Sequence, residues 1–300
     1  MAILIGTASW AEATLIKSGR FYPAEARTPE QRLRFYASQF PVVEVDSTFY
    51  ALPSFTNSQL WASRTPDGFT FDVKLFRAFT LHQTPLKSLP KDVRDQAEGL
   101  ANKAGNVYYA ELPEALKDEL WQLFLDGIAP LKSAGKLGYL LLQLPPWGTK
   151  NRDHVAHVEE CLNRMDGYQV ALEFRNATWL SERSRASTLA MLREWNVPVV
   201  IVDEPQGFAS SMPLVWEATS PEMAVVRFHG RNKETWTKKG LPTSALRFNY
   251  LYSDDELREF VAPMQQIAQA TRQVHALFNN CYEDKAVQNA RRFMEMLGAG

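Results

Sequence analysis

The chain has 300 residues, of which 45% are hydrophobic and 22% are charged, and its formal net charge is -1. This composition is typical of a globular protein with a substantial core. The near-neutral charge argues against a dominant electrostatic mode of nucleic-acid binding, although a local basic patch would escape this average.

Cysteine usage and hydropathy indicate the compartment. Cys161 and Cys281 lie far apart and provide neither a disulfide framework nor a CxxC pair, which fits a reducing environment. No stretch approaches the roughly 18 apolar residues of a membrane span. No basic segment with a signal-like apolar core precedes the first predicted strand. We therefore expect a soluble, cytoplasmic monomer.

Eight short apolar runs, rich in Val, Ile, Leu and Phe, predict eight strands. In chain order they cover residues 3–6, 42–45, 69–75, 137–144, 169–174, 197–202, 223–228 and 274–278. Helical patterns fall between them. Thr28 is the predicted N-cap of the first helix and Ser253 that of the helix over 254–271. Further helices are predicted over 119–134, 185–195 and 286–297.

This alternation of strands and helices predicts parallel strands joined by crossover helices. Eight such units in about 300 residues suit an α/β fold of the closed (β/α)8 TIM type. A doubly wound open sheet is the alternative, but no Gly-rich dinucleotide-binding turn follows any strand. The connections after the third and seventh strands, residues 76–136 and 230–273, are long. No linker or repeat interrupts the pattern, so residues 1–300 are predicted to form a single domain.

Polar or ionisable residues follow the apolar body of every predicted strand. The carboxyl ends of the strands form the active site in barrels of this type. Because side chains alternate along a strand, Glu173 and Arg175 share one face, as do Arg227 and His229. For any single strand, a polar residue at the end is ordinarily explained by contact with solvent. The occurrence of such residues at all eight strand ends predicts instead that they line one pocket. Its predicted residues are Glu44, Asp46, Lys74, Gln143, Glu173, Arg175, Asp203, Arg227, His229, Asn279 and Asn280.

These residue types allow several kinds of chemistry. Neighbouring carboxylates drive their pKa values apart and can supply a general acid and a general base; the candidates are Glu44, Asp46, Glu173 and Asp203. Basic side chains can hold an anionic group; the candidates are Lys74, Arg175, Arg227 and His229. A divalent cation, Mg or Mn, is an open alternative with the ligand set Glu44, Asp46, Glu173 and His229. Mutual ion pairing without further function stays open as well.

Two weaker signals lie outside this set. Basic residues surround Trp236 in the connection after the seventh strand: Arg231, Lys233, Lys238 and Lys239. Such a loop can contact a nucleic-acid backbone and a base, but it is more often simply solvated. His154, His157 and Cys161 lie at helical spacing, and we interpret them as an exposed helix face rather than as a metal site.

The ordered motifs resemble the YecE-like family, domain-of-unknown-function family seventy-two. The opening strand motif is residues 5–10, followed by Phe-Tyr-Pro at 21–23, and the most specific signature is residues 43–50. Further matches are Trp61, Thr65-Pro66, 69–74, Gln-Leu-Pro-Pro at 143–146, Glu-Phe-Arg at 173–175 with Trp179, Arg-Phe-His-Gly at 227–230, residues 250–253, 279–280 and 289–290.

The resemblance covers nearly the whole chain and implies a TIM-type barrel, without an established reaction. Two positions depart from the family pattern. Thr80 and His82 are separated by Leu81, and Asn176 stands where the family often has histidine. The matched polar set is Glu44, Lys74, Glu173, Arg175, Arg227 and His229.

Three kinds of function remain open. The first is an enzyme that hydrolyses a phosphate-containing or phosphodiester substrate, with Glu44 or Glu173 as general base and His229 as proton donor. The anionic group of the substrate would be stabilised by three cations, Lys74, Arg175 and Arg227. A glycosidase or sugar isomerase would use the same carboxylates. The second is a binding protein for a small anionic ligand without turnover. The third is nucleic-acid binding through residues 231–239.

Overall fold

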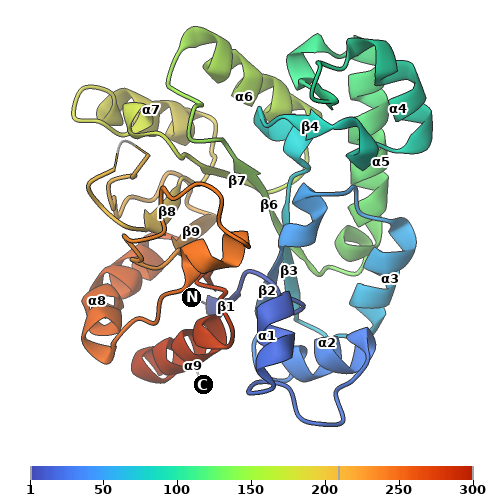
Figure 1. The fold of residues 1–300 in the computed structure, drawn as a ribbon. Coiled ribbons are helices and arrows are strands. Elements are labelled where there is room, and N and C mark those ends of the chain that lie inside the picture. Colours follow the sequence, from blue (N-terminus) through green and yellow to red (C-terminus); the bar gives the residue numbers. More distant parts are fainter. Residues whose placement is uncertain (1, 209, 299–300) are drawn as a thin grey trace.

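The computed structural model describes residues 2–208 and 210–298. Parallel strands form its central sheet: β1 (Ala2–Thr7), β2 (Val42–Val45), β3 (Thr70–Lys74), β6 (Leu137–Gln143), β7 (Val170–Glu173), β8 (Val200–Asp203), β9 (Met223–Phe228) and β10 (Gln273–Phe278). Neighbours follow the order β7-β6-β3-β2-β1-β10-β9-β8. The strands lie at the centre of the molecule with helices around them (Figure 1). The predicted TIM-type barrel is confirmed.

The barrel closes between β7 and β8, the two ends of this strand order. A single parallel bridge joins Leu172 to Val199, and the Leu172 N–H donates to the Pro198 carbonyl at 2.9 Å. The sixth strand of the barrel is thus shorter than the predicted range 197–202. Proline has no N–H to donate, so a continuous ladder cannot form across Pro198.

Helices occupy the connections between the strands. They are α1 (Ala13–Ser18), α2 (Pro29–Ala37), α3 (Phe55–Ser63), α4 (Lys91–Ala97), α5 (Glu114–Ser133), α6 (Arg152–Arg164), α7 (Arg185–Glu194), α8 (Asp254–Ala270) and α9 (Lys285–Leu297). Both predicted N-caps are confirmed. Thr28 forms a capping box with Gln31, and Ser253 forms one with Glu256.

The two long connections are confirmed, and the helix predicted from residue 119 begins earlier, at Glu114. Strong helix formers directly follow Pro113, whereas the apolar stripe used for the prediction starts later. The connection after β3 carries α4, α5 and an antiparallel ribbon of β4 (Thr84–Pro85) and β5 (Asn106–Val107). The connection after β9 holds the short 3-10 helix η7 (Ser244–Phe248) and α8. No helix in the described ranges is both long and apolar enough to cross a bilayer.

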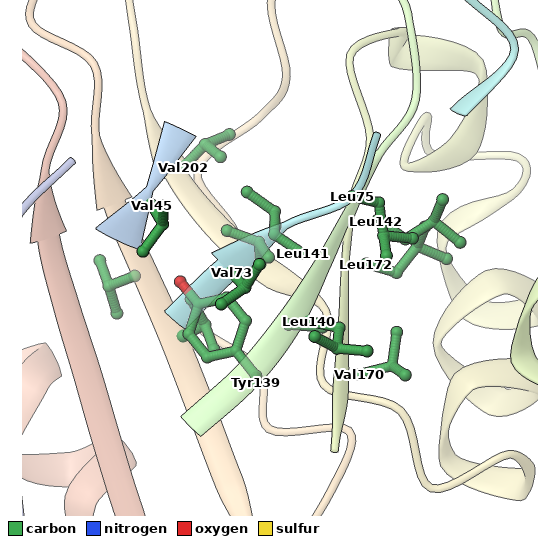
Figure 2. Close-up of a cluster of buried hydrophobic side chains, with 14 of the residues drawn as sticks. Val45, Val73, Leu75, Tyr139, Leu140, Leu141, Leu142, Val170, Leu172 and Val202 are labelled. Carbon is green, nitrogen blue, oxygen red and sulfur yellow. The ribbon is translucent and has the colours of Figure 1, made fainter. Parts of the chain in front are cut away.

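Side-chain alternation along β6 separates the barrel interior from the layer under the helices. Tyr139 and Leu141 lie on one side of the strand, and Leu140 and Leu142 lie on the other with Leu172 (Figure 2). All five side chains are buried in the hydrophobic core. Tyr139, Leu141 and Gln143 therefore face the barrel interior, where the polar residues of the other strand ends also lie.

A polar pair lies inside the barrel near the start of β6. Asp72 Oδ2 and His275 Nδ1 are 2.8 Å apart, and both side chains are fully buried. Asp72 Oδ1 also accepts the N–H of Tyr139 at 3.2 Å. Gly138 leaves room for this pair, because a Cβ at that position would lie 2.1 Å from Asp72 Oδ1.

We predict that Gly138→Ala destabilises the fold by about 1–3 kcal/mol, because the added methyl group would displace the Asp72 carboxylate from His275. Gly99→Ala is the matched control, since a Cβ at Gly99 meets nothing within 4 Å, and its effect should stay within about 0.5 kcal/mol. Denaturant unfolding of the three proteins measures both values. Equal stability of the Gly138 variant and the wild type would contradict the prediction.

Candidate active site

One guanidinium group joins two strands that lie far apart in the sequence. Arg227 of β9 donates from Nη2 to Glu44 Oε1 of β2 at 2.5 Å, and from Nη1 to Glu173 Oε2 of β7. All three side chains have an exposed fraction of 0%. A buried charge is tolerated only when it is paired and hydrogen-bonded, and this bridge pairs Arg227 with both carboxyl groups. The buried Arg227 Nε has no hydrogen-bond partner within the described residues.

Glu173 is the residue on which the other predicted site residues converge. Its Oε1 accepts hydrogen bonds from Gln143 at 2.7 Å and from Arg175 at 3.3 Å, and His229 Nε2 lies 3.0 Å away. The two pairs expected from strand alternation, Glu173 with Arg175 and Arg227 with His229, therefore meet in one cluster. Strand ends from β6, β7 and β9 supply its members.

Asn279 fixes the tautomer of His229. The Asn279 amide Nδ2 lies 2.8 Å from His229 Nδ1, and an amide N–H can only donate. Nδ1 is therefore the acceptor, and Nε2 carries the proton that is shared with Glu173. The Glu173 carboxylate orients the imidazole through Nε2, and Nδ1, whose lone pair accepts from Asn279, is the nitrogen that can take up a proton.

Two cations lie at the mouth of the barrel above this buried layer. Lys74 Nζ is 3.3 Å from Asp46 Oδ1 and lies over the Phe49 ring at 5.0 Å. The Arg175 guanidinium lies over the Trp236 ring at 5.0 Å. Both cationic side chains keep an exposed fraction of 13%. Both cations are thus partly open to solvent, unlike the fully buried Arg227.

Burial and charge drive the two buried carboxyl groups to opposite protonation states. Burial raises the pKa of Glu44 to about 8, although the charge of Arg227 acts in the opposite direction. Burial alone would also raise the pKa of Glu173, but the charge of Arg227 and the hydrogen bond from His229 hold it well below its usual value. Glu44 is thus largely protonated at neutral pH while Glu173 is ionised.

Burial also changes the titration of His229. It lowers the pKa of His229 to about 4, against the opposing charge of Glu173. The imidazole is therefore neutral at pH 7. Arg227 and Glu173 are thus the oppositely charged pair of this buried layer.

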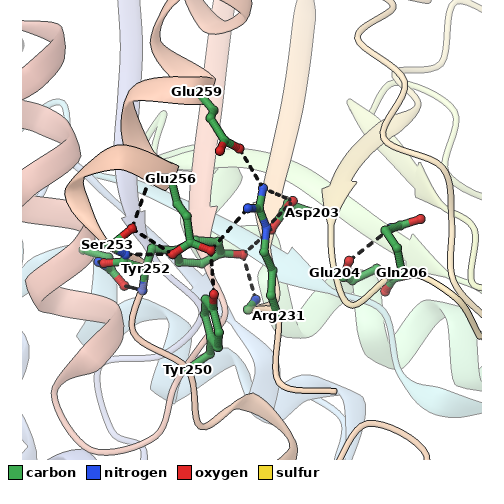
Figure 3. A network of polar contacts seen from close by, with 11 residues as sticks. Asp203, Glu204, Gln206, Arg231, Tyr250, Tyr252, Ser253, Glu256 and Glu259 are labelled. Carbon is green, nitrogen blue, oxygen red and sulfur yellow. Dashed lines mark hydrogen bonds and ion pairs between the residues drawn. The ribbon is translucent and has the colours of Figure 1, made fainter. Parts of the chain in front are cut away.

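Two of the predicted site residues, Asp203 and Asn280, make their hydrogen bonds outside the cluster around Glu173. The Asp203 carboxylate accepts from Arg231 at 3.0–3.1 Å and from the Tyr252 hydroxyl at 2.6 Å. Arg231 also reaches Glu256 and Glu259, and Figure 3 shows this network. Asn280 Nδ2 donates to the Tyr250 carbonyl and to Asn289 Oδ1, both at 2.9 Å. These contacts anchor the connection after β9 and the start of α9.

Glu204 and Tyr139 belong to the cluster but were not predicted. Glu204 Oε2 lies 3.4 Å from Arg175 Nη1, and the Tyr139 hydroxyl donates to Glu44 Oε2 at 3.2 Å. The register of β8 against β9 would have identified Glu204 as an inward-facing residue. Val202 pairs with the inward-facing Arg227, so residue 204, and not 203, faces the interior. Tyr139 lies two alternations before Gln143 on β6.

The residues proposed as metal ligands do not form a metal site. Arg227 lies between the carboxylates of Glu44 and Glu173, where a cation would have to bind, and Asp46 is paired with Lys74. Across residues 2–208 and 210–298, no group of three or more His, Cys, Asp or Glu side chains is arranged to hold a metal ion. The donor set therefore does not fit the Mg or Mn alternative.

Two other sequence signals acquire a structural explanation. Trp236, the aromatic of the basic 231–239 segment, is buried against Arg175 rather than exposed to a base. The expected exposed face with His154, His157 and Cys161 is wrong for Cys161, which is fully buried. His157 Nε2 and the Cys161 thiol both approach the Phe79 carbonyl, at 2.9 and 3.4 Å, so this helix face packs on the connection after β3.

A family model described as "Protein of unknown function DUF72" matches residues 4–300 of the chain. The chain belongs to the DUF72 family. The resemblance seen in the sequence motifs is thereby confirmed. The UPF0759 protein YunF of Bacillus subtilis is 31% identical over 297 residues, which cover 98% of this chain and 94% of that protein.

Two solved DUF72 structures show the same fold. A DUF72 family protein from Enterococcus faecalis has a TM-score of 0.80 and 24% identity, with 99% of this chain and 96% of the other covered. One from Thermotoga maritima has a TM-score of 0.75 and 27% identity, with 99% and 100% covered. Both matches span the complete barrel, and so support a single α/β architecture for DUF72 chains.

The raised pKa of Glu44 predicts a pH-dependent stability. In the unfolded chain this carboxyl loses its proton near pH 4.5, whereas in the folded protein it keeps it until about pH 8. The folded state thus binds more protons in this interval, and stability falls as pH rises through it. Relative to Glu44→Gln, the wild type should lose roughly 2–4 kcal/mol of unfolding free energy between about pH 5 and pH 8.

Urea unfolding of both proteins across this pH range tests the prediction. Glu111→Gln is the control, because Glu111 is an exposed carboxyl, and its difference from the wild type should stay flat. A flat difference for Glu44→Gln as well would show that the buried carboxyl is already ionised at neutral pH.

Proposed function

We propose that this chain is a hydrolase that acts on an anionic, phosphate-containing or phosphodiester substrate at the mouth of the barrel. The proposal rests on the nitrogen donors of Arg175 that have no hydrogen-bond partner in the described part of the chain. Its Nη1 contacts Glu173 and Glu204, while Nη2 and Nε form no hydrogen bond within the described residues. An arginine with free donors in a fixed position at a strand end suits bidentate binding of a phosphoryl group.

Lys74 supports the same interpretation from the other side of the mouth. Its ammonium group has one ion-pair partner, Asp46, at 3.3 Å, and that carboxylate is itself partly exposed. A second cation near Arg175 allows charge that develops on phosphoryl oxygens to be stabilised from two directions. We assign Lys74 and Arg175 as the anion-binding pair, with Gln143 and Asn279 beside them as neutral donors.

The proton-transfer group in this proposal is His229, supported by Glu173. The imidazole is neutral at pH 7, and its proton-accepting nitrogen is Nδ1, whose lone pair accepts the Asn279 amide N–H. In this proposal the substrate displaces Asn279 from Nδ1, and Nδ1 then accepts a proton from the attacking water and returns it to the leaving group. Glu173 stabilises the imidazolium that forms. The sequence suggested His229 as the proton donor; the lowered pKa favours the acceptor role in the first step.

Glu44 and Arg227 serve as positioning residues in this proposal. Both are fully buried and hold the Glu173 carboxylate in place from below. The sequence left Glu44 and Glu173 as alternative general bases. A protonated Glu44 cannot accept a proton, and Glu173 has four donors around it, so neither is free to act as the base.

The glycosidase alternative places its two carboxyl groups on either side of the scissile bond. Arg227 occupies the space between Glu44 and Glu173, so this pair does not suit that role. Binding of an anion without turnover uses the same mouth as the hydrolase, and only an activity measurement separates the two.

We predict that Arg175→Gln lowers kcat/KM for a phosphodiester such as bis(p-nitrophenyl) phosphate by about 100- to 1000-fold, because it removes the charge at the developing anion. Lys103→Gln, which changes an exposed lysine in the connection after β3, is the control and should retain full activity. Steady-state kinetics with phosphomonoester and phosphodiester substrates measures both.

Two outcomes would change the assignment. Equal kinetics of Arg175→Gln and the wild type would show that the mouth is not the site. If neither protein turns over any phosphoester, but inorganic phosphate raises the melting temperature of the wild type and not of Arg175→Gln, the chain binds anions without hydrolysis.

A further inference from the structure

A groove with only positive charge lies beside the mouth, between the loops after β6 and β7. Its volume is about 780 Å³, and its lining includes Lys150, Arg152 and Arg183 together with the hydroxyl groups of Thr178, Ser181 and Ser184. None of its lining residues is acidic. We propose that this groove is a second anion-binding site that takes a phosphoryl group.

The three cations of the groove lack acidic partners. Among the residues that the structure describes, Lys150, Arg152 and Arg183 form no ion pair. At the other end of α6, by contrast, Arg164 pairs with three carboxylates, those of Glu114, Asp118 and Glu160. Cations gathered around one concavity without ion-pair partners create a positive potential that attracts anions.

Lys150 is held in this groove by neutral groups. Its ammonium donates to Ser187 Oγ at 2.7 Å and to Thr188 Oγ1 at 2.9 Å, both near the start of α7. The first turn of α7 has no acidic residue and begins with Arg185. A helix N-terminus carries a partial positive charge, so Lys150 adds to an unfavourable field that a bound anion would relieve. The first turn of α8, by comparison, carries three acidic residues.

The groove and the mouth share the same two loops. One loop begins at Gln143 in the site and continues to Lys150, and the other begins at Arg175 and continues to Arg183. The loops are tied together, because Asn176 Nδ2 donates to the Pro146 carbonyl at 2.7 Å and the Lys150 N–H donates to Thr178 Oγ1 at 2.9 Å. The mouth and the groove are therefore carried by the same pair of hydrogen-bonded loops.

The presence of a second cationic site next to the mouth narrows the class of substrate, and this step rests on the proposed function. A substrate held at both places carries at least two separate phosphoryl groups, one at Arg175 and one in the groove. Polyphosphorylated small molecules and short phosphodiester chains share this chemistry. A monophosphate would leave the groove cations uncompensated.

Calorimetric titration with inorganic pyrophosphate at low ionic strength tests the groove by itself. The key comparison is between Arg175→Gln and the triple variant that adds Arg152→Gln and Arg183→Gln. Neither groove arginine makes a side-chain hydrogen bond within the described residues, so their removal should leave the fold intact. The control adds Lys87→Gln and Lys103→Gln instead, which removes the same charge from exposed positions outside the groove.

We expect the wild type to bind two equivalents of pyrophosphate, and Arg175→Gln to bind one. The triple variant should lose this remaining site, with affinity lower by about 10- to 100-fold for each arginine removed, whereas the lysine control should keep it. Equal binding by Arg175→Gln and the triple variant, or no binding by the wild type, would overturn the groove proposal. If Arg175→Gln binds as the wild type does while Arg152→Gln/Arg183→Gln loses one equivalent, the groove stands and the proposed function fails.

Discussion

The contact of Arg227 with Glu44 and Glu173 is the interaction on which the site depends. A guanidinium removed from water is costly to bury, and two carboxylates around it leave one negative charge in excess. Burial raises the pKa of Glu44 to about 8, which favours a proton on this carboxyl and reduces the excess. The pKa of Glu173 is instead held well below its usual value, and Gln143, Arg175 and His229 all orient toward this carboxylate.

Tyr139 connects this layer to the interior of the barrel below it. Its hydroxyl donates to Glu44, and its backbone N–H donates to Asp72, which is paired with His275. Polar groups thus continue down the barrel interior in contact with one another instead of being scattered among the aliphatic side chains. Changes in the lower pair are expected to reach Glu44 through this tyrosine, so packing and protonation are coupled along the barrel axis.

Local patterns in the sequence were sufficient for the strands, the caps and much of the site. Glu173 with Arg175 and Arg227 with His229 could be paired because alternation along one strand decides which side chains share a face. Whether Asp203 or Glu204 faces the barrel interior depends instead on the register of β8 against β9. Pro198 alters where β8 begins and therefore hides this register from the sequence pattern. The position of Trp236 over Arg175 follows from the path of a long loop, and no local pattern encodes that path.

The single bridge between Leu172 and Val199 has a consequence for how the barrel responds to ligands. Glu173 and Arg175 end one side of this junction and Glu204 ends the other, and the contact of Arg175 with Glu204 spans it. In the proposed function, an anion that competes for Arg175 also weakens the Arg175–Glu204 contact, which spans the least paired strand junction of the barrel. In the proposed function, ligand occupancy at Arg175 and separation of β7 from β8 are therefore thermodynamically linked, because both act on the same contact.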